Sequence, residues 1–188
     1  MSDTTQVDVR GEQGLEQTAS RLPVWQPAVD ILLEGHGRTP GADAPVDLDL
    51  SRSVGWFTAL YPLQLVPGGD SPAHAIKAIK EQLRQVPGQG LGYGVLRYLN
   101  EGALAGQLAA RASPQVTFNY LGQFDPGRSA GGLFAWAEES LGASLDPSAD
   151  ADSEWVITGQ VRDGCLQLSW RYGTERFDRD VVQALAER

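Results

Sequence analysis

The sequence predicts an α/β fold, a mixed sheet with flanking helices, from three observations. Two segments with alternating apolar residues flank Asp163-Gly164, a pair that is typical of two-residue hairpin turns. Segment 71–86 repeats apolar residues every three or four positions, which indicates a helix that is packed on one side. A second segment of this kind, 179–187, follows a capping aspartate at the end of the chain.

Composition limits the classes of function. The 188 residues carry 15 Lys and Arg against 24 Asp and Glu, a net charge of −9, which argues against nucleic-acid binding. Cys165 is the single cysteine, so we expect neither an internal disulfide nor a cysteine-based zinc site, and a reducing, cytoplasmic location. We also expect no signal peptide and no membrane helix, since no apolar run approaches about 20 residues.

The chain is predicted to divide into a polar tail, residues 1–23, and a folded lobe, residues 24–188. The tail holds scattered single apolar residues without a convincing period, and we expect it to be weakly ordered. An alternative is that the alternating stretch Gln6–Arg10 forms a short edge strand.

Apolar periods and turn residues predict the elements of the first half of the lobe. Strands are expected in 24–38 and 53–66, with a bulge or break near Pro62, because proline donates no ladder hydrogen bond. A helix over 71–86 begins at Ser71 and Pro72. We expect it to bury one face, made of Ile76, Ile79, Leu83 and Val86.

The second half of the lobe is predicted in the same way. A glycine-rich loop over 88–94 precedes a single helix over 95–112 and a strand over 114–124. Residues 126–153 are expected to be loop, with a short strand around Phe134. In the hairpin, one face of the first strand is expected to hold Trp155, Ile157, Gly159 and Val161, and one face of the second Leu166, Leu168, Trp170 and Tyr172. In the terminal helix the inward residues are expected to be Val181, Val182 and Leu185.

The stretch "EGHGR", 34–38, holds the first candidate site residues. Glu34 and His36 would share a face of a strand, although the glycines also allow a turn. A metal site is disfavoured because the only other histidine, His74, lies on the predicted helix, and no "GxSxG" motif supports a serine nucleophile. Spacing alone also fits a surface pair between Glu34 and Arg38.

Two other stretches are candidates for a site. "GQGLGYG" follows a predicted helix rather than a strand and lacks a Lys-Ser/Thr ending, so it does not predict a nucleotide site and is expected to allow close approach of the backbone. Asn119 is a polar amide between Phe118 and Tyr120 on a predicted strand, and it must find hydrogen-bond partners or face a cleft.

Four segments together resemble the epimerization domains of nonribosomal peptide synthetases, relatives of the condensation domains. They are "EGHGR" (34–38), "SRSVGWFTALYP" (51–62), "VPGQGLGYG" (86–94) and "FNYLGQFD" (118–125). The resemblance implies one lobe of the two-lobed fold of chloramphenicol acetyltransferase.

The resemblance also implies a reaction, α-proton exchange on an aminoacyl or peptidyl thioester. The substrate would be carried on the phosphopantetheine of a peptidyl carrier protein, with no cofactor bound by the chain itself. Glu34 would be a catalytic acid/base, with Tyr120 and Asn119 contacting the substrate or its enolate. Arg52 and His36 are further substrate-site candidates, and Arg52 could instead tether the two lobes.

The sequence departs from this family in one large respect. The family's His-His-x-x-x-Asp-Gly motif on the N-terminal lobe is absent, because the two histidines are isolated. The chain therefore resembles the C-terminal lobe only, and we expect no activity from it alone but a structural or association role, as a homodimer or with a partner lobe. The alternative is half of an active epimerase whose other lobe lies on another chain or has been removed from this one.

Overall fold

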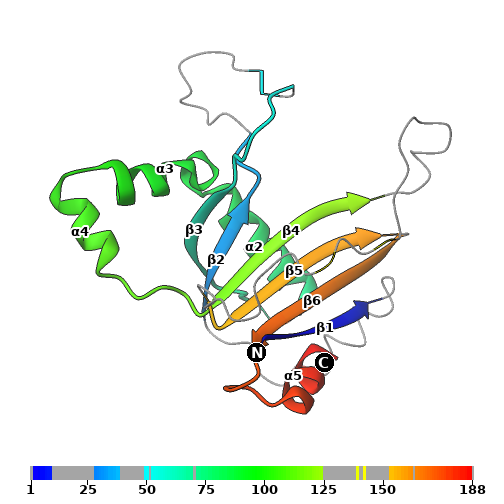
Figure 1. The fold of residues 1–188 in the computed structure, drawn as a ribbon. Helices are drawn as coiled ribbons and strands as arrows, with labels where there is room; N and C mark the ends of the chain where they lie inside the picture. Colours follow the sequence, from blue (N-terminus) through cyan, green and yellow to red (C-terminus); the bar gives the residue numbers. More distant parts are fainter. Residues whose placement is uncertain are drawn as a thin grey trace. The chain divides into compact units, whose positions relative to one another are not determined.

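The computed structural model describes residues 2–9, 28–38, 49–50, 52–69, 71–124, 139, 142, 153–162 and 164–187. They fall into two compact units, one within the ranges Met1–Pro23 and Tyr120–Arg188 and the other within Val24–Asn119. Figure 1 labels their helices and strands. The Val24–Asn119 unit carries most of the candidate site residues.

The sheet of this unit is mixed, as predicted. Strand β2 (Val29–Gly35) pairs antiparallel with β3 (Ala59–Leu65) and parallel with the start of β4 (Val116–Phe124). Its residue Leu33 stands opposite Tyr61 on one side and Phe118 on the other. Such mixed pairing places the strand that ends in "EGHGR" between two neighbours.

The break expected near Pro62 does not occur. Strand β3 continues from Ala59 to Leu65, and Pro62 is in register with Leu32 of β2. Among the described strands β3 pairs only with β2, so it is an edge strand, and an edge strand can hold a proline without losing a ladder partner on its free side.

Helix α2 (Pro72–Arg84) begins as predicted but turns a partly different face inward. The Ser71 side chain accepts a hydrogen bond from the His74 backbone N–H at 3.4 Å, which caps the first turn. The residue that becomes buried is Ala75, whereas Ile76 is 64% exposed and Leu83 is 39% exposed. The predicted buried face is correct only in part, since Ile79 and Val86 are half-buried while Ile76 and Leu83 are exposed.

A polar side chain fixes α2 to the strand pair. The Gln82 amide accepts from the Val66 N–H at 2.9 Å and donates to the Val66 carbonyl at 2.7 Å, just after β3 ends. Both backbone groups of Val66 are satisfied by one residue of the helix.

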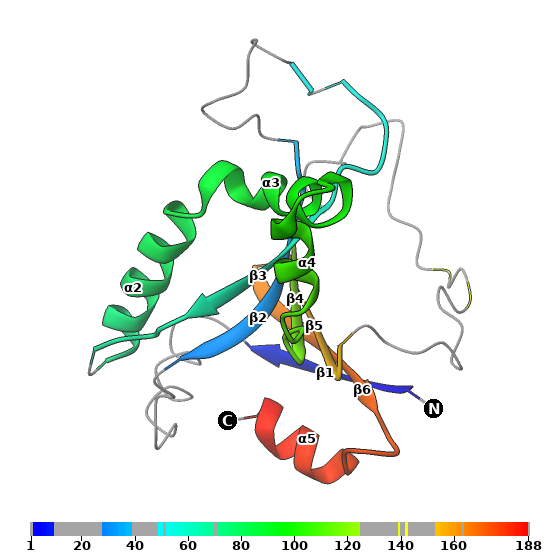
Figure 2. The ribbon, with the colours of Figure 1, turned by 90° about the vertical axis from the view of Figure 1, so that its left-hand side faces the viewer.

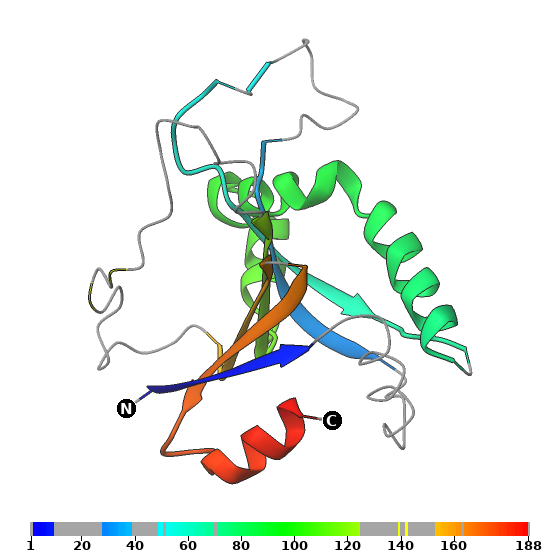
Figure 3. The same ribbon diagram turned by 90° about the vertical axis from the view of Figure 1, so that its right-hand side faces the viewer.

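The segment that follows α2 is more helical than predicted. The expected glycine loop is a 3₁₀ turn, η1 (Pro87–Gly90), followed by one turn of α-helix, α3 (Leu91–Gly94). Figure 2 and Figure 3 show that the chain bends sharply between α2 and α3. The expected single helix is split into η2 (Val95–Leu99) and α4 (Ala103–Ala109), because Asn100 is extended.

Gly90 is the glycine of this segment that packing requires. Its φ is +83°, and a Cβ atom there would lie 1.9 Å from the Tyr61 ring. The close approach expected of the glycine stretch is thus to a side chain of β3.

The other unit contains the hairpin, which is confirmed. Strands β5 (Trp155–Arg162) and β6 (Cys165–Gly173) are antiparallel, with Arg162 opposite Cys165 around a two-residue turn. The predicted faces also match, since the registered pairs include Trp155–Tyr172, Ile157–Trp170, Gly159–Leu168 and Val161–Leu166.

The ends of the chain lie in this unit as well. Strand β1 (Ser2–Val9) pairs antiparallel with β6. The predicted tail thus contains the edge strand of the alternative prediction, but the strand begins at Ser2 rather than at Gln6. Helix α5 (Arg179–Ala186) begins at Asp178, whose carboxylate accepts from the Asp180 N–H at 2.8 Å. Of its three expected inward residues Val182 is fully buried, but Val181 (64%) and Leu185 (46%) are exposed. The strand expected around Phe134 lies outside the described residues.

Candidate functional site

Glu34 and Asn119 are brought together by the pairing of β2 with β4. They occupy registered positions of the parallel pair, so their side chains lie on the same face of the sheet. Asn119 Nδ2 donates a hydrogen bond to Glu34 Oε2 at 2.7 Å, across 85 residues of sequence. Both side chains are half-buried. The amide of Asn119 fixes one carboxylate oxygen of Glu34, and this carboxylate is the hydrogen-bond partner that Asn119 is expected to need.

The turn after β2 is held by Arg38. Its guanidinium donates to the carbonyl of Ser53 at 2.6 Å and to that of Gly55 at 3.3 Å, and it lies 4.7 Å from the centre of the Phe57 ring. The contact joins "EGHGR" to "SRSVGWFTALYP", two of the segments that carry the family resemblance. Arg38 therefore orders the backbone that leads away from Glu34.

His36 is exposed and bonds to the backbone of the turn. Its Nδ1 accepts a hydrogen bond from the Arg38 backbone N–H at 3.0 Å, which places the proton of the neutral ring on Nε2. Gly35 separates Glu34 from His36, and the chain leaves the strand at that glycine. The two side chains are thus engaged with different partners, Asn119 for one and the turn backbone for the other.

The remaining candidates are more exposed. Arg52 is exposed, and Tyr120 is 51% exposed at the first position of the other unit. Tyr120 follows Asn119 directly in β4, and successive side chains of a strand point to opposite faces. The roles predicted for Arg52 and Tyr120 rest on the resemblance alone.

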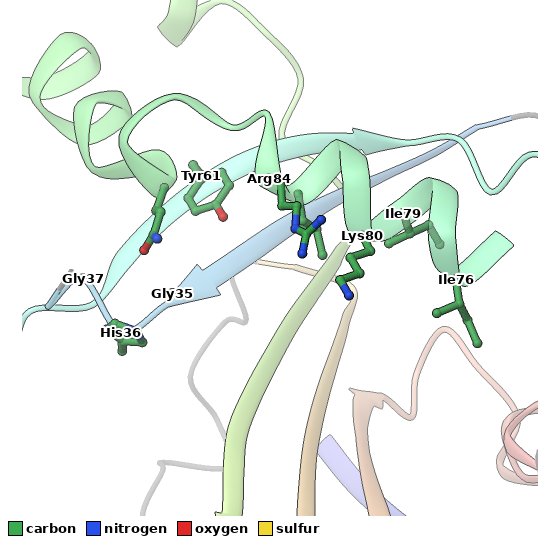
Figure 4. Close-up of a pocket in the computed structure, with 10 residues that line it drawn as sticks. Gly35, His36, Gly37, Tyr61, Ile76, Ile79, Lys80 and Arg84 are labelled. Carbon is green, nitrogen blue, oxygen red and sulfur yellow. The ribbon is translucent and has the colours of Figure 1, made fainter. Parts of the chain in front are cut away.

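A pocket of about 650 Å³ lies beside the turn, within the Val24–Asn119 unit (Figure 4). The end of β2 and Tyr61 of β3 form one side, and α2 forms the other. Burial raises the pKa of the Tyr61 hydroxyl above its ordinary value of 10.0, so this group is neutral near pH 7. Sequence reasoning missed the pocket, although the exposed side of α2 carried a signal, Lys80 and Arg84 four residues apart beside Leu83.

The described residues contain no group of three or more His, Cys, Asp or Glu side chains that could hold a metal ion. Over the same part of the chain, no helix has the length and apolar character needed to cross a membrane.

Comparison with known proteins identifies the family. The Condensation domain family matches residues 25–188. A linear gramicidin synthase of Brevibacillus parabrevis is 42% identical over 182 residues, which cover 92% of this chain and 2% of that protein. Chondramide synthase cmdD of Chondromyces crocatus is 43% identical over 154 residues, or 82% of this chain and 4% of that protein.

Solved structures extend the comparison. The epimerization domain from the third module of tyrocidine synthetase B matches with a TM-score of 0.76 and 27% identity, over 99% of this chain and 45% of that chain. The nonribosomal peptide synthetase FmoA3, in a form bound to α-methyl-L-serine-AMP, shares the fold at a TM-score of 0.54 and 20% identity, over 97% and 21% of the two chains.

The chain belongs to the Condensation domain family. It is a partial domain of the condensation and epimerization type found in nonribosomal peptide synthetases, and its α/β fold is that of these domains. It spans 2% and 4% of the two synthases named above and 45% of the tyrocidine epimerization domain.

Proposed function

We propose that this chain supplies the Glu34-bearing half of an epimerization site for an aminoacyl or peptidyl thioester on the phosphopantetheine of a carrier protein. The observation that supports this most strongly is the Asn119–Glu34 hydrogen bond of 2.7 Å, which orients a half-buried carboxylate at the end of a strand. The likeness to the tyrocidine epimerization domain, at 27% identity, supports the choice of this reaction.

The chemistry requires two groups on opposite sides of the substrate. A base removes the proton beside the thioester carbonyl, and an acid returns a proton to the other face of the planar enolate. The carboxylate of Glu34, oriented by the hydrogen bond from Asn119, is the group that would take the substrate proton. A hydrogen-bonded carboxylate keeps its orientation through both proton transfers, which favours a near-attack geometry.

The facing group must come from elsewhere. The 188 residues contain only His36 and His74, so the His-His-x-x-x-Asp-Gly motif is not among them. The proposal is therefore that the chain does not epimerize by itself and that a second lobe completes the site. Tyr120, Arg52 and His36 stay as substrate-site candidates.

An association role is the second candidate function. Large apolar side chains are exposed in the Val24–Asn119 unit, namely Val54, Trp56, Tyr98 and Leu99. Exposed apolar groups of this size favour contact with another polypeptide, either a partner lobe or a second copy of this chain.

Reconstitution tests the proposal. The chain and a separately produced N-terminal lobe that carries the histidine motif would be incubated with a loaded carrier protein in deuterium oxide. Mass spectrometry should show α-deuterium with the pair and none with the chain alone. Glu34→Gln should reduce exchange at least about 100-fold, the scale of acid–base contributions, whereas Glu101→Gln, at an exposed carboxylate, should not.

Two results would contradict the proposal. Deuterium uptake by the isolated chain would show that no second lobe is needed. If the Glu34→Gln chain with the second lobe exchanged the α-proton as fast as the wild-type chain with that lobe, Glu34 would have no role in the reaction.

A further inference from the structure

The pocket beside the turn lies on the side of β2 opposite Glu34. It is lined by Gly35 rather than by Glu34, and neighbouring residues of a strand face opposite ways. Tyr61 lines it from β3 and is in register with Leu33, which shares the Gly35 face. The pocket is therefore on the other side of the strand from the Glu34 carboxylate, and of the substrate-site candidates only His36 is among its described lining residues.

The pocket is cationic in a chain of net charge −9. None of the ten described residues that line it is acidic, whereas two of them, Lys80 and Arg84, are basic. These two stand one helical turn apart on the same side of α2, and Figure 4 shows both side chains projecting from that helix.

The donors of the pocket are largely unused. Among the described residues, neither the Lys80 ammonium nor the Tyr61 hydroxyl has a hydrogen-bond or ion-pair partner. Arg84 donates through one nitrogen to Glu81 at 2.8 Å, on the exposed side of the helix, which leaves its other N–H groups available. Glu81 does not line the pocket. Unused donors around a concave surface suit an anion.

The remaining wall is apolar. Ile76, Ile79 and Leu83 of α2 line the pocket, and Ile76 and Leu83 are exposed there although the sequence pattern predicts them to be buried. A volume of about 650 Å³ is within the range of small-molecule sites, roughly 300–1,000 Å³. A ligand that satisfies the whole surface must combine an anionic head with an apolar body.

We propose that this pocket binds a small amphiphilic anion, with its carboxylate or phosphate head at Lys80 and Arg84 and its apolar chain against Ile76, Ile79 and Leu83. In this arrangement the Tyr61 hydroxyl would donate a hydrogen bond to the anionic head of the ligand. The apolar chain of the ligand would lie along the same three aliphatic side chains of α2.

Titration with simple probes tests the binding. Octanoate, octyl phosphate, octanol and octylammonium, each below its micelle-forming concentration, would be added to the ¹⁵N-labelled chain and the amide shifts followed. The two anions should shift signals of Gly35–Gly37 and α2 with saturable curves, and their ratio tells which head is preferred. Octanol should bind about tenfold more weakly, and octylammonium should shift none of these signals. Across hexanoate, octanoate and decanoate the affinity should rise roughly fourfold per methylene until the pocket is filled.

Substitutions of the pocket's basic residues distinguish binding in this pocket from non-specific binding to the protein. Lys80→Gln with Arg84→Gln should lower octanoate affinity about tenfold or more, since charge-assisted hydrogen bonds are lost. Lys77→Gln is the matched control, because Lys77 is an exposed lysine of the same helix that does not line the pocket. Circular dichroism would check that the variants are folded. Equal shifts from octanoate and octylammonium, or equal affinity in the double variant and the control, would overturn the proposal.

Discussion

Gly37 is the residue on which the turn after β2 depends. Its φ is +62°, and a Cβ atom would lie 1.6 Å from the Phe57 carbonyl oxygen. Left-handed backbone already costs an L-residue about 1–2 kcal/mol, and here the obstacle is backbone that cannot rotate away. The glycine therefore lets Arg38 reach the Ser53 and Gly55 carbonyls.

We predict that Gly37→Ala lowers the free energy of unfolding by about 2 kcal/mol or more, measured by urea denaturation. Gly106→Ala is the control, since Gly106 lies in α4 with no atom within 4 Å of a built Cβ. That change should raise the free energy of unfolding by about 0.5–1 kcal/mol. If both variants changed the free energy of unfolding equally, the close approach of Gly37 to the Phe57 carbonyl would not be what requires a glycine in this turn.

Tyr61 gives the fold a dependence on alkaline pH. Burial raises the pKa of its hydroxyl above 10.0, so the folded protein keeps a proton that the unfolded chain loses. The resulting contribution to stability is complete below pH 10 and declines as the pH rises through the folded-state pKa. We predict that Tyr61→Phe, which keeps the ring against Gly90, makes the free energy of unfolding fall less steeply above pH 10 in chemical denaturation. If the free energy of unfolding fell equally steeply above pH 10 in both proteins, the Tyr61 hydroxyl would not be a cause of the pH dependence.

At the scale of elements, Gln82 decides how α2 is attached. One side chain satisfies both the N–H and the carbonyl of Val66. These two hydrogen bonds explain why the polar residue Gln82 is half-buried on a helix that also offers four regularly spaced aliphatic residues.

We predict that Gln82→Ala lowers the free energy of unfolding by about 1 kcal/mol and speeds hydrogen exchange at the Val66 amide, because that N–H loses its acceptor. Gln85→Ala, three residues along at an exposed position, is the matched control and should leave Val66 exchange unchanged. Slow exchange at Val66 in the Gln82 variant would show that another group holds this strand end.

At the scale of the whole molecule, exposed apolar side chains predict association. Val54 is 100% exposed and Trp56 is 91% exposed, on the segment that Arg38 holds. Transfer of such surface from water is favourable by about 25 cal/mol per Å².

We therefore predict that light scattering at high protein concentration gives a mass above the 20.2 kDa of one chain, and that Trp56→Ser moves it toward that value. Addition of the lobe with the histidine motif should compete with self-association if both use this surface. A wild-type chain that stays monomeric at high concentration would contradict the prediction.

The sequence by itself determined those features that depend on near neighbours in the chain. The hairpin turn after Arg162, the caps at Ser71 and Asp178, and strand β2 follow from local turn chemistry and from periods of two or about 3.6 residues. The family was also recognisable from four short segments, and Glu34 could be named from one of them.

Only the tertiary structure decided which neighbours those elements meet. It paired Glu34 with Asn119 across 85 residues, kept β3 continuous through Pro62 at a sheet edge, and buried Ala75 in place of Ile76. Burial and hydrogen bonding depend on the shape of the opposing surface, and a period along one segment carries no information about that surface. The cationic pocket beside Tyr61 went unpredicted for this reason. The spacing of Lys80 and Arg84 could be read from the sequence, but the strand end and the edge strand that complete the pocket could not.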